Sequence, residues 1–186
     1  GTGGSKGTTF SIDWGDGNKV EYEGAKTVTN KPLDNTIKIY GDNILILLAD
    51  NIGLTALDVT NAPRLSKLSC SNNKLSELDL SHNESLTGLY CSENLISKPL
   101  NISQCTNMRA FDISRNAIPG QLDLSQMSSL SSFKCFNNAI TEILLPKTAP
   151  LNTIDCDSNR IATLDLTGIN DLAELNCGFN ELTELT

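Results

Sequence analysis

Cys105 and His82 are the residues of this chain that could supply a nucleophile and its base. The chain has six cysteines and a single histidine, and alignment of the repeats described below matches His82 to Gln104, the neighbour of Cys105. A cysteine nucleophile also needs an environment that stabilises its thiolate, an orienting group and an oxyanion site in a cleft. Both residues fall in a turn that predicts no cleft. A cysteine-dependent enzyme is therefore the third of our hypotheses, in which Cys105 is the more reactive thiol.

Metal and cofactor chemistry find little support in the residue types and their spacing. A zinc site needs C-x-x-C or histidine partners, and neither occurs here. No glycine-rich loop that could hold a phosphate is present. Asp13 and Asp16 flank the turn cluster that begins at Gly15 and could hold a calcium ion, although aspartate is also a common turn former. We expect no cofactor, and calcium at these two residues is the alternative to a structural turn.

The charge of the chain excludes two classes of partner. Lysine and arginine total 14 against 22 aspartates and glutamates, so the net charge is -8 and the isoelectric point about 4.6. Affinity for nucleic acid rests on neutralising phosphates, and anionic membranes also attract basic segments. No apolar run approaches the roughly 18 residues that a membrane span needs. We therefore expect no nucleic-acid partner and no insertion of this chain into a membrane.

A repeat of 21 or 22 residues organises most of the chain. Each copy follows the pattern L-x-x-L-x-C-x-x-N-x-L, and a degenerate earlier copy starts at Ile44, with Ile52 where asparagine is expected. Each copy before the last is followed by a second half-repeat, of which Leu78-Asp79-Leu80 is an example, and this half recurs with the same period. The copies are Leu65, Leu68, Cys70, Asn73, Leu75; Leu86, Leu89, Cys91, Asn94, Ile96; Met108, Phe111, Ile113, Asn116, Ile118; Leu130, Phe133, Cys135, Asn138, Ile140; Leu151, Ile154, Cys156, Asn159, Ile161; and Leu172, Leu175, Cys177, Asn180, Leu182.

The spacing within each copy predicts a strand that cannot fold alone. Two inward residues are separated by one outward residue, which is the strand period. Stacked coils bury the apolar side, so stability comes from neighbouring coils. Seven coils at about 4.8 Å per strand predict a parallel sheet roughly 30 Å wide. The asparagine amide, with donors and an acceptor, is expected to satisfy backbone groups left unpaired in a bend.

At these residues the chain resembles the leucine-rich repeat family, specifically the cysteine-ladder type of internalin-like bacterial surface proteins. The resemblance covers residues 44–186. It implies a right-handed solenoid of α/β type dominated by β structure, with a parallel sheet on its concave face. It also implies a bacterial protein that is secreted or held at the cell surface, with a lipid anchor as one mode of attachment, and a role in adhesion or host contact. Ile113 departs from the pattern at a cysteine position, and the first coil lacks both cysteine and asparagine.

We predict that the cysteines in the repeat are free. An even number of cysteines in an exported protein suggests disulfides. Side chains on adjacent parallel strands, however, run side by side at about the strand spacing, which is longer than a disulfide prefers. Buried thiols also serve as small apolar residues. The repeated cysteines therefore should form an inert inward column.

The amino-terminal segment has a different pattern. Residues 1–9 are expected to form a flexible linker, and residues 10–43 a small β cap on the first coil, since a bare terminal coil exposes its core. Alternation predicts strands at residues 10–14, 20–22 and 36–40. Asp13-Trp14-Gly15-Asp16-Gly17 resembles the W-G-D-G turn of PKD-like modules. We expect this cap to shield Ile46 and Leu48.

Outward strand positions should build the ligand-binding surface. Most are small, which lets a partner approach closely, and five larger residues stand out. Exposed aromatics can stack on a sugar or anchor a protein side chain. The primary hypothesis is a non-catalytic module that binds protein or glycan on this concave face, and the alternative is a structural spacer or stalk. The candidate ligand-binding residues are Tyr90, Arg115, Lys134, Phe136 and Phe179.

The last coil should leave an open sheet edge. The sequence given stops at Thr186, within the second half of that coil. An edge strand around Leu175 and Cys177 would present unpaired backbone groups. We expect self-association through this edge, or a natural chain that continues beyond it.

Overall fold

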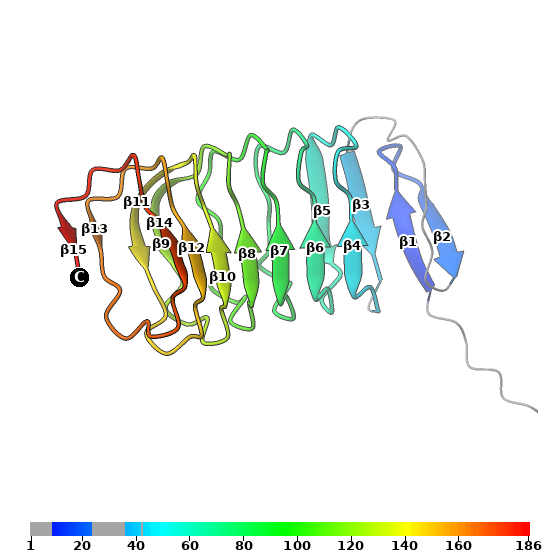
Figure 1. Ribbon diagram of the computed structural model, residues 1–186. Coiled ribbons are helices and arrows are strands. Elements are labelled where there is room, and N and C mark those ends of the chain that lie inside the picture. Colours follow the sequence, from blue (N-terminus) through cyan, green and yellow to red (C-terminus); the bar gives the residue numbers. More distant parts are fainter. Residues whose placement is uncertain (1–8, 24–35, 42) are drawn as a thin grey trace, which may run out of the picture.

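A computed structural model describes residues 9–23, 36–41 and 43–186 and shows a mostly β solenoid of about seven turns (Figure 1). These residues form strands and turns, with no helix and hence no helix able to cross a membrane. The expected linker, residues 1–9, lies outside the described residues except for Thr9. The strands are β1 (Thr9–Asp13), β2 (Lys19–Glu23), β3 (Thr36–Tyr40), β4 (Ile46–Leu48), β5 (Ala56–Asn61), β6 (Lys67–Ser69), β7 (Gly88–Tyr90), β8 (Ala110–Asp112), β9 (Pro119–Asp123), β10 (Ser132–Lys134), β11 (Ala139–Leu144), β12 (Thr153–Asp155), β13 (Thr163–Leu164), β14 (Glu174–Asn176) and β15 (Glu184–Leu185).

One parallel sheet, which we call the main sheet, contains a short strand from each coil. Its order is β4-β6-β7-β8-β10-β12-β14, and equivalent repeat positions pair directly, as Leu68 does with Leu89 (Figure 1). The middle residue of each strand points into the solenoid, and from β6 to β12 this residue is fully or almost fully buried. The period of two therefore gives the main sheet one apolar inner face and one outer face, as the repeat predicts.

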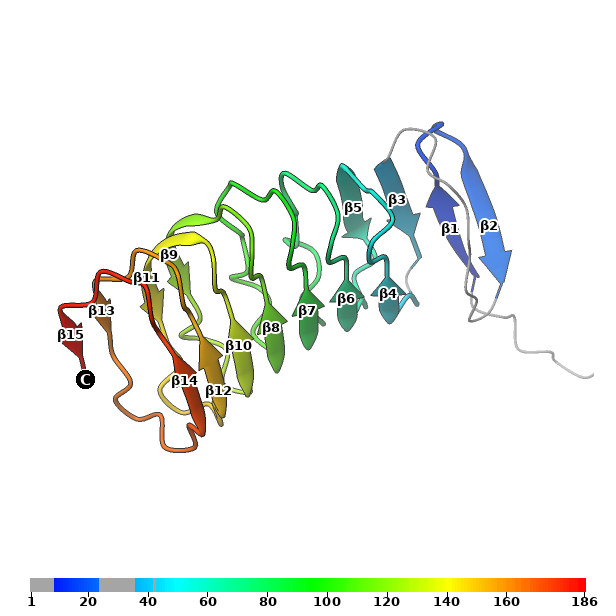
Figure 2. The same ribbon diagram turned by 45° about the horizontal axis from the view of Figure 1, so that its top comes forward.

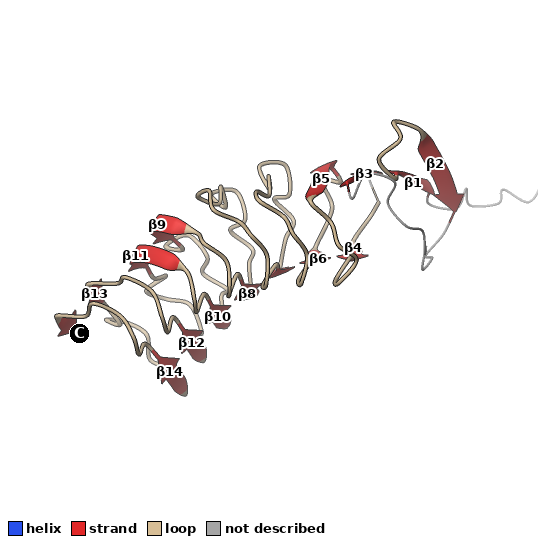
Figure 3. Ribbon diagram, turned by 90° about the horizontal axis from the view of Figure 1, so that it is seen from above, coloured by secondary structure: helices blue, strands red, loops and turns tan. Residues whose placement is uncertain are grey.

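A second layer of strands lies across the solenoid from the main sheet, as the view from above shows (Figure 3). It contains β5 and the parallel pairs β9–β11 and β13–β15. The aspartates of the second half-repeat accept a hydrogen bond from the backbone N–H two residues later, as Asp123 does from Ser125 at 2.9 Å. These carboxylates are thus turn formers, which holds also for Asp58, Asp79 and Asp165.

A single apolar core fills the space between the two layers. Leucine, isoleucine and cysteine side chains from successive coils form one continuous cluster, and Phe111 and Phe133 pack with ring centroids 5.7 Å apart. Fully burying one leucine or isoleucine side chain contributes about 1.5–3 kcal/mol. Because each coil shares its buried face with its neighbours, the core is distributed evenly along the solenoid.

The repeated asparagine is a bridge between consecutive coils, which confirms its expected role. Asn94 Nδ2 donates to the carbonyls of Cys70 in the preceding coil and of Cys91 in its own coil, at 3.0 and 3.1 Å. Its Oδ1 accepts from the Leu75 N–H of the preceding coil at 3.0 Å. The same bridge recurs at the equivalent positions, which are Asn73, Asn116, Asn138, Asn159 and Asn180.

The residue before each repeated asparagine, and before Ile52 in the first coil, adopts a left-handed backbone conformation, which the repeat did not predict. This column turns the chain at the end of each main-sheet strand, with φ between 45° and 55°. Asparagine tolerates this region better than most residues, and other side chains are strained there. The residues are Asn51, Asn72, Glu93, Arg115, Asn137, Ser158 and Phe179.

The cysteines form the expected inward column and are all free. Cys70, Cys91, Cys135 and Cys156 are fully buried, and Cys177 in the last coil is partly exposed. Burial raises the pKa of the Cys70 thiol to about 12 and raises the pKa of Cys91 well above its ordinary value. The thiols are therefore protonated at neutral pH and act as small apolar residues.

The amino-terminal strands lie at the predicted positions, but they extend the second layer instead of covering the main sheet. β1 pairs with β2 and β3 in antiparallel fashion, and β3 pairs with β5 in parallel, giving the order β2-β1-β3-β5 (Figure 2). The expectation that Ile46 and Leu48 are shielded is wrong, because their exposed fractions are 59% and 65%. The reason is that no described strand pairs with the outer edge of β4.

Replacing Asn94 with leucine should cost more stability than its change in volume suggests. The substitution leaves the buried Leu75 N–H without its acceptor, which costs about 1–3 kcal/mol. It also removes one of the two amide donors from each of the Cys70 and Cys91 carbonyls, at about 1 kcal/mol per hydrogen bond. We expect the free energy of unfolding, measured by urea denaturation, to fall by about 3 kcal/mol or more. Asn107→Leu is the control, because Asn107 is exposed and its side chain donates a hydrogen bond to the Glu84 backbone carbonyl at 3.2 Å. Equal effects of the two substitutions would contradict the bridging role.

Thiol labelling should separate the last coil from the rest. In the native protein we expect Ellman's reagent at pH 8 to modify Cys177 first, because it alone is partly exposed, and all six cysteines to react in denaturant. Cys177→Ser should remove the fast native phase, whereas Cys105→Ser should leave it unchanged. Fast labelling of Cys105 in the native protein would contradict the burial of its thiol in the structure.

Candidate functional site

The outer face of the main sheet carries three columns of side chains, one from each outward position. Most are small or polar, so the backbone lies close to solvent. Their register follows the strand pairing. The columns are Lys67, Gly88, Ala110, Ser132, Thr153, Glu174; Ser69, Tyr90, Asp112, Lys134, Asp155, Asn176; and Ser71, Ser92, Ser114, Phe136, Asp157, Gly178.

Tyr90 lies flat on this face instead of pointing away from it. A Cβ atom at Gly88 would lie 3.4 Å from Tyr90 Cε2, an ordinary van der Waals distance, so the edge of the ring lies beside the Gly88 position on this face. The Lys67 ammonium lies 5.3 Å from the centroid of the same ring. This cation–π contact and the flat orientation hold Tyr90 in one half-buried position before any partner binds.

Phe136 is held in a similar way two strands away. Arg115 places its guanidinium carbon 5.5 Å from the centroid of the Phe136 ring. Arg115 Nη1 also donates to Glu93 Oε1 at 3.1 Å, which fixes the guanidinium between two coils. The structure thus joins two of the candidate residues, Arg115 and Phe136, whose contact the repeat alone did not predict. Sequence reasoning did not identify Gly88 as part of the Tyr90 site or Glu93 as part of the Phe136 site.

Lys134 lies between two carboxylates, as its column position predicts. In the strand register it is opposite Asp112 on one side and Asp155 on the other. Burial raises the pKa of Asp155, and the nearby charges of Asp157 and Glu174 raise it further, while Lys134 acts in the opposite direction. The carboxyl-terminal end of the outer face therefore concentrates negative charge.

Phe179 is the most exposed large apolar residue of the candidate set. Its exposed fraction is 87%, and its backbone is left-handed with φ of 45°. It lies in the corner column and follows Gly178 in the last coil. No packing contact of the core explains a phenylalanine at this strained position, so Phe179 is a candidate for contact with a partner.

Cys105 and His82 do not form a catalytic pair. The expectation that Cys105 is the more reactive thiol is wrong, because Cys105 is fully buried and burial raises its pKa to about 11. Its Sγ lies 3.8 Å from the Asn83 carbonyl oxygen. His82 is exposed and contacts Ser81 Oγ through Nδ1 at 3.0 Å. The thiol therefore has neither a base nor access to a substrate.

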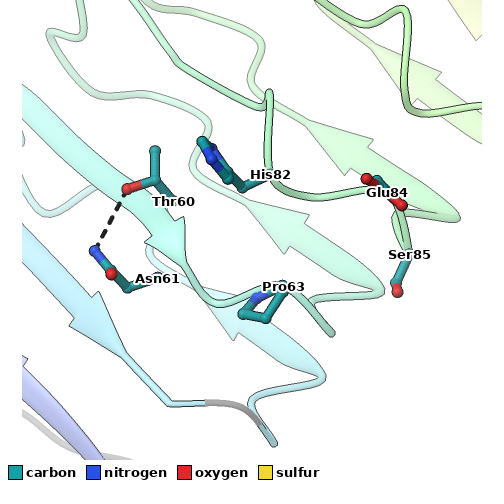
Figure 4. A pocket seen from close by; sticks show the side chains of 6 residues that line it. All are labelled: Thr60, Asn61, Pro63, His82, Glu84 and Ser85. Carbon is teal, nitrogen blue, oxygen red and sulfur yellow. Dashed lines mark hydrogen bonds between the residues drawn. The ribbon is translucent and has the colours of Figure 1, made fainter.

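His82 instead lines a shallow surface pocket of about 440 Å³ between neighbouring coils (Figure 4). The residues around it come from the turns that contain Thr60 and His82, and Cys105 is not among them. The Thr60 hydroxyl accepts a hydrogen bond from Asn61 Nδ2 at 3.4 Å. The lining of this pocket contains hydroxyl groups and the His82 imidazole, but His82 Nδ1 contacts Ser81 Oγ, which lies outside the lining. Its lining residues are Thr60, Asn61, Pro63, His82, Glu84 and Ser85.

Asp13 and Asp16 hold a turn together. Asp13 Oδ1 accepts from the backbone N–H groups of Gly15 and Gly17 at 2.9 and 3.0 Å. Asp16 accepts from the backbone and side chain of Asn18, and these bonds lower its pKa. Within the described ranges, no group of three or more metal-binding side chains comes together.

Comparison with known proteins agrees with the geometry. No protein-family model matches the chain, and a search of curated proteins gives no match. Among solved structures, the chain is similar to one described as the functional domain of InlJ from Listeria monocytogenes, which includes a cysteine ladder. The TM-score is 0.73 and the sequence identity 36%, over 78% of this chain and 32% of that chain. The chain thus spans about a third of that structure, and its fold is that of an internalin-like, leucine-rich-repeat solenoid.

Proposed function

We propose that this chain is a non-catalytic module of a secreted or surface-attached bacterial protein, and that it binds a protein or glycan on the outer face of the main sheet. The observation that supports this most is the pair of aromatic rings, Tyr90 and Phe136, each held by a cation on a face of small residues. The likeness to InlJ fits a bacterial surface protein. In this proposal the solenoid is right-handed and the outer face is concave.

Pre-organisation is the physical reason to expect binding at these rings. An aromatic side chain that already lies in one orientation loses little conformational entropy when a partner covers it. Tyr90 and Phe136 are two strand-to-strand spacings apart in the main sheet, which is roughly 10 Å along the axis of the solenoid. A ring at each site can stack on the apolar side of a sugar or on a protein side chain. Lys134 lies in the same region and can contribute a hydrogen bond to such a partner.

The amino-terminal strands have a supporting role in this proposal. Residues 10–43 act as a β cap that closes the second layer, and residues 44–186 form the repeat domain. The Ile12 and Trp14 side chains are buried against the first coil, which supports this role. The resemblance of the turn to PKD-like modules stays a prediction.

The double substitution Tyr90→Ala and Phe136→Ala distinguishes a binding module from a spacer. We expect it to abolish or reduce at least tenfold the binding of any partner found by a glycan array or a host-protein screen, because aromatic anchors at interfaces often contribute about 2 kcal/mol or more. Leu95→Ala is the matched control, since Leu95 is exposed away from the columns of the outer face. Unchanged binding in the double variant would favour the spacer hypothesis.

We also propose self-association through the edge strand β14. Leu175 and Cys177 are partly exposed, whereas their equivalents in earlier coils are buried. In those coils the cysteine N–H donates to the next strand, as Cys156 does to Asn176 at 2.8 Å. The Cys177 N–H has the same orientation at the edge of the sheet and is available to a second strand.

Light scattering over a hundredfold range of concentration should detect this association. We expect the average mass to rise with concentration above that of the 20.1 kDa monomer. A constant monomer mass throughout the range would exclude the proposed contact.

A further inference from the structure

Charge is distributed unevenly along the outer face of the main sheet. The columns from β8 to β14 carry four carboxylates and a single ammonium group, whereas Lys67 is the charged residue of the columns at β6 and β7. Lys134 is shared between Asp112 and Asp155. Within the described part of the chain, neither Asp157 nor Glu174 forms an ion pair.

Asp157 lies between Phe136 and Gly178 in its column of the outer face. In the coil register it follows Phe136, and Gly178 follows it, so that about one strand spacing separates each from the next. A Cβ atom at Gly178 would lie 2.8 Å from Asp157 Oδ1, which is closer than a real side chain permits. Glycine therefore lets this carboxylate lie over the last coil, next to the corner that carries Phe179. Ser158 Oγ donates to the other oxygen, Oδ2, at 2.7 Å and leaves Oδ1 facing this space.

Two further features of this end have no role in the fold. Phe179 combines 87% exposure with a left-handed backbone, a conformation that costs a phenylalanine stability without burying its ring. Ser114 lies in the same column as Phe136, one coil earlier, and its fully buried Oγ has no hydrogen-bond partner. The column thus contains an unsatisfied hydroxyl at Ser114, the half-buried ring of Phe136 and a carboxylate without an ion pair at Asp157. The exposed ring of Phe179 belongs to the adjoining corner of the last coil.

We infer that this end of the outer face is a subsite for a cationic side chain, arginine in particular, of a polypeptide partner. We call the subsite formed by Phe136, Asp157 and Phe179 the cation subsite. The inference rests on the proposed function, because it assigns the chemistry of the partner for that face. A guanidinium group can stack on an aromatic ring while it donates two hydrogen bonds to a carboxylate. Phe136 precedes Asp157 in the same column, and Phe179 lies at the adjoining corner of the last coil.

The charge pattern favours a cationic polypeptide over a glycan at this end. A neutral sugar can donate hydroxyl hydrogen bonds to the carboxylates but does not neutralise their excess charge, and an acidic sugar would be repelled by them. A basic side chain instead relieves the repulsion among Asp155, Asp157 and Glu174. The Lys67–Tyr90 and Arg115–Phe136 contacts show that rings on this face already accept cations on one side.

A nuclear magnetic resonance titration with a short peptide tests the subsite directly. The probe is acetyl-Gly-Arg-Gly-Arg-Gly-amide, and the comparison peptide carries citrulline, the neutral isostere of arginine, at both arginine positions. We expect shifts of the backbone amide signals of Asp157, Gly178 and Phe179 with the arginine peptide only. Asp157→Asn and Phe179→Ser should each weaken this binding by about tenfold, the loss expected for one charge-assisted hydrogen bond or one cation–π contact.

Glu142→Gln is the matched control, because it removes the same charge from the second layer. We expect it to change the affinity by less than about twofold, since an exposed distant charge is screened by salt. Equal weakening by Glu142→Gln and Asp157→Asn, equal binding of the citrulline peptide, or shifts elsewhere on the molecule would each overturn the subsite. If Tyr90→Ala and Phe136→Ala then still weaken the binding of a glycan or another partner, the proposed function stands without the cation subsite.

Discussion

The structure depends above all on the asparagine that bridges consecutive coils. A chain that turns sharply at the end of every short strand leaves buried carbonyl and N–H groups with no partner in the sheet. The asparagine amide satisfies carbonyls of two coils at once and accepts an N–H from the preceding coil, as Asn94 does. Since each amide needs the neighbouring coil in exact register, the side-chain ladder fixes the stacking as much as the main-sheet hydrogen bonds do. The left-handed residue that precedes the asparagine turns the backbone at the same corner.

This constraint separates the positions that carry the fold from those that are free to vary. Leucine, cysteine and asparagine columns are determined by burial and by the corner, so they differ little from coil to coil. The outer columns lie outside the apolar core, so core packing does not determine why the second column holds Tyr90 in one coil and Asp155 in another. Differences along these columns, including the rings of Tyr90 and Phe136, are where a partner can be recognised without disturbing the stack. The carboxylates that gather toward β14 are one such difference.

Much of the fold could be predicted from the sequence because the repeat samples the same environment several times. The inward columns, the free thiols and the parallel sheet all follow from a period of two within a period of about 21 residues. The corner conformation could not be predicted, since Glu93, Arg115 and Phe179 carry no signal for a left-handed backbone. Cys105 was misjudged because its place outside the repeated column suggested exposure, whereas the second half of each coil also has buried positions. The contacts of Arg115 with Phe136, and of Tyr90 with Gly88, depend on side-chain directions that a repeat pattern does not specify.

The amino-terminal end shows that the two layers of a solenoid are closed separately. β1 pairs with β3 in antiparallel fashion and so ends the parallel stacking of the second layer with a hairpin. Among the residues that the structure describes, no strand lies beside the outer edge of β4, and the apolar side chains there are exposed, namely Leu45, Ile46, Leu48 and Ile52. The β1–β2 hairpin also projects beyond β3. A second solenoid therefore could not stack on both layers at this end. The amino-terminal strands therefore oppose end-to-end polymerisation of the solenoid at this end, although they leave β4 uncovered. Such polymerisation is the main risk for a repeat protein whose sheets have open edges.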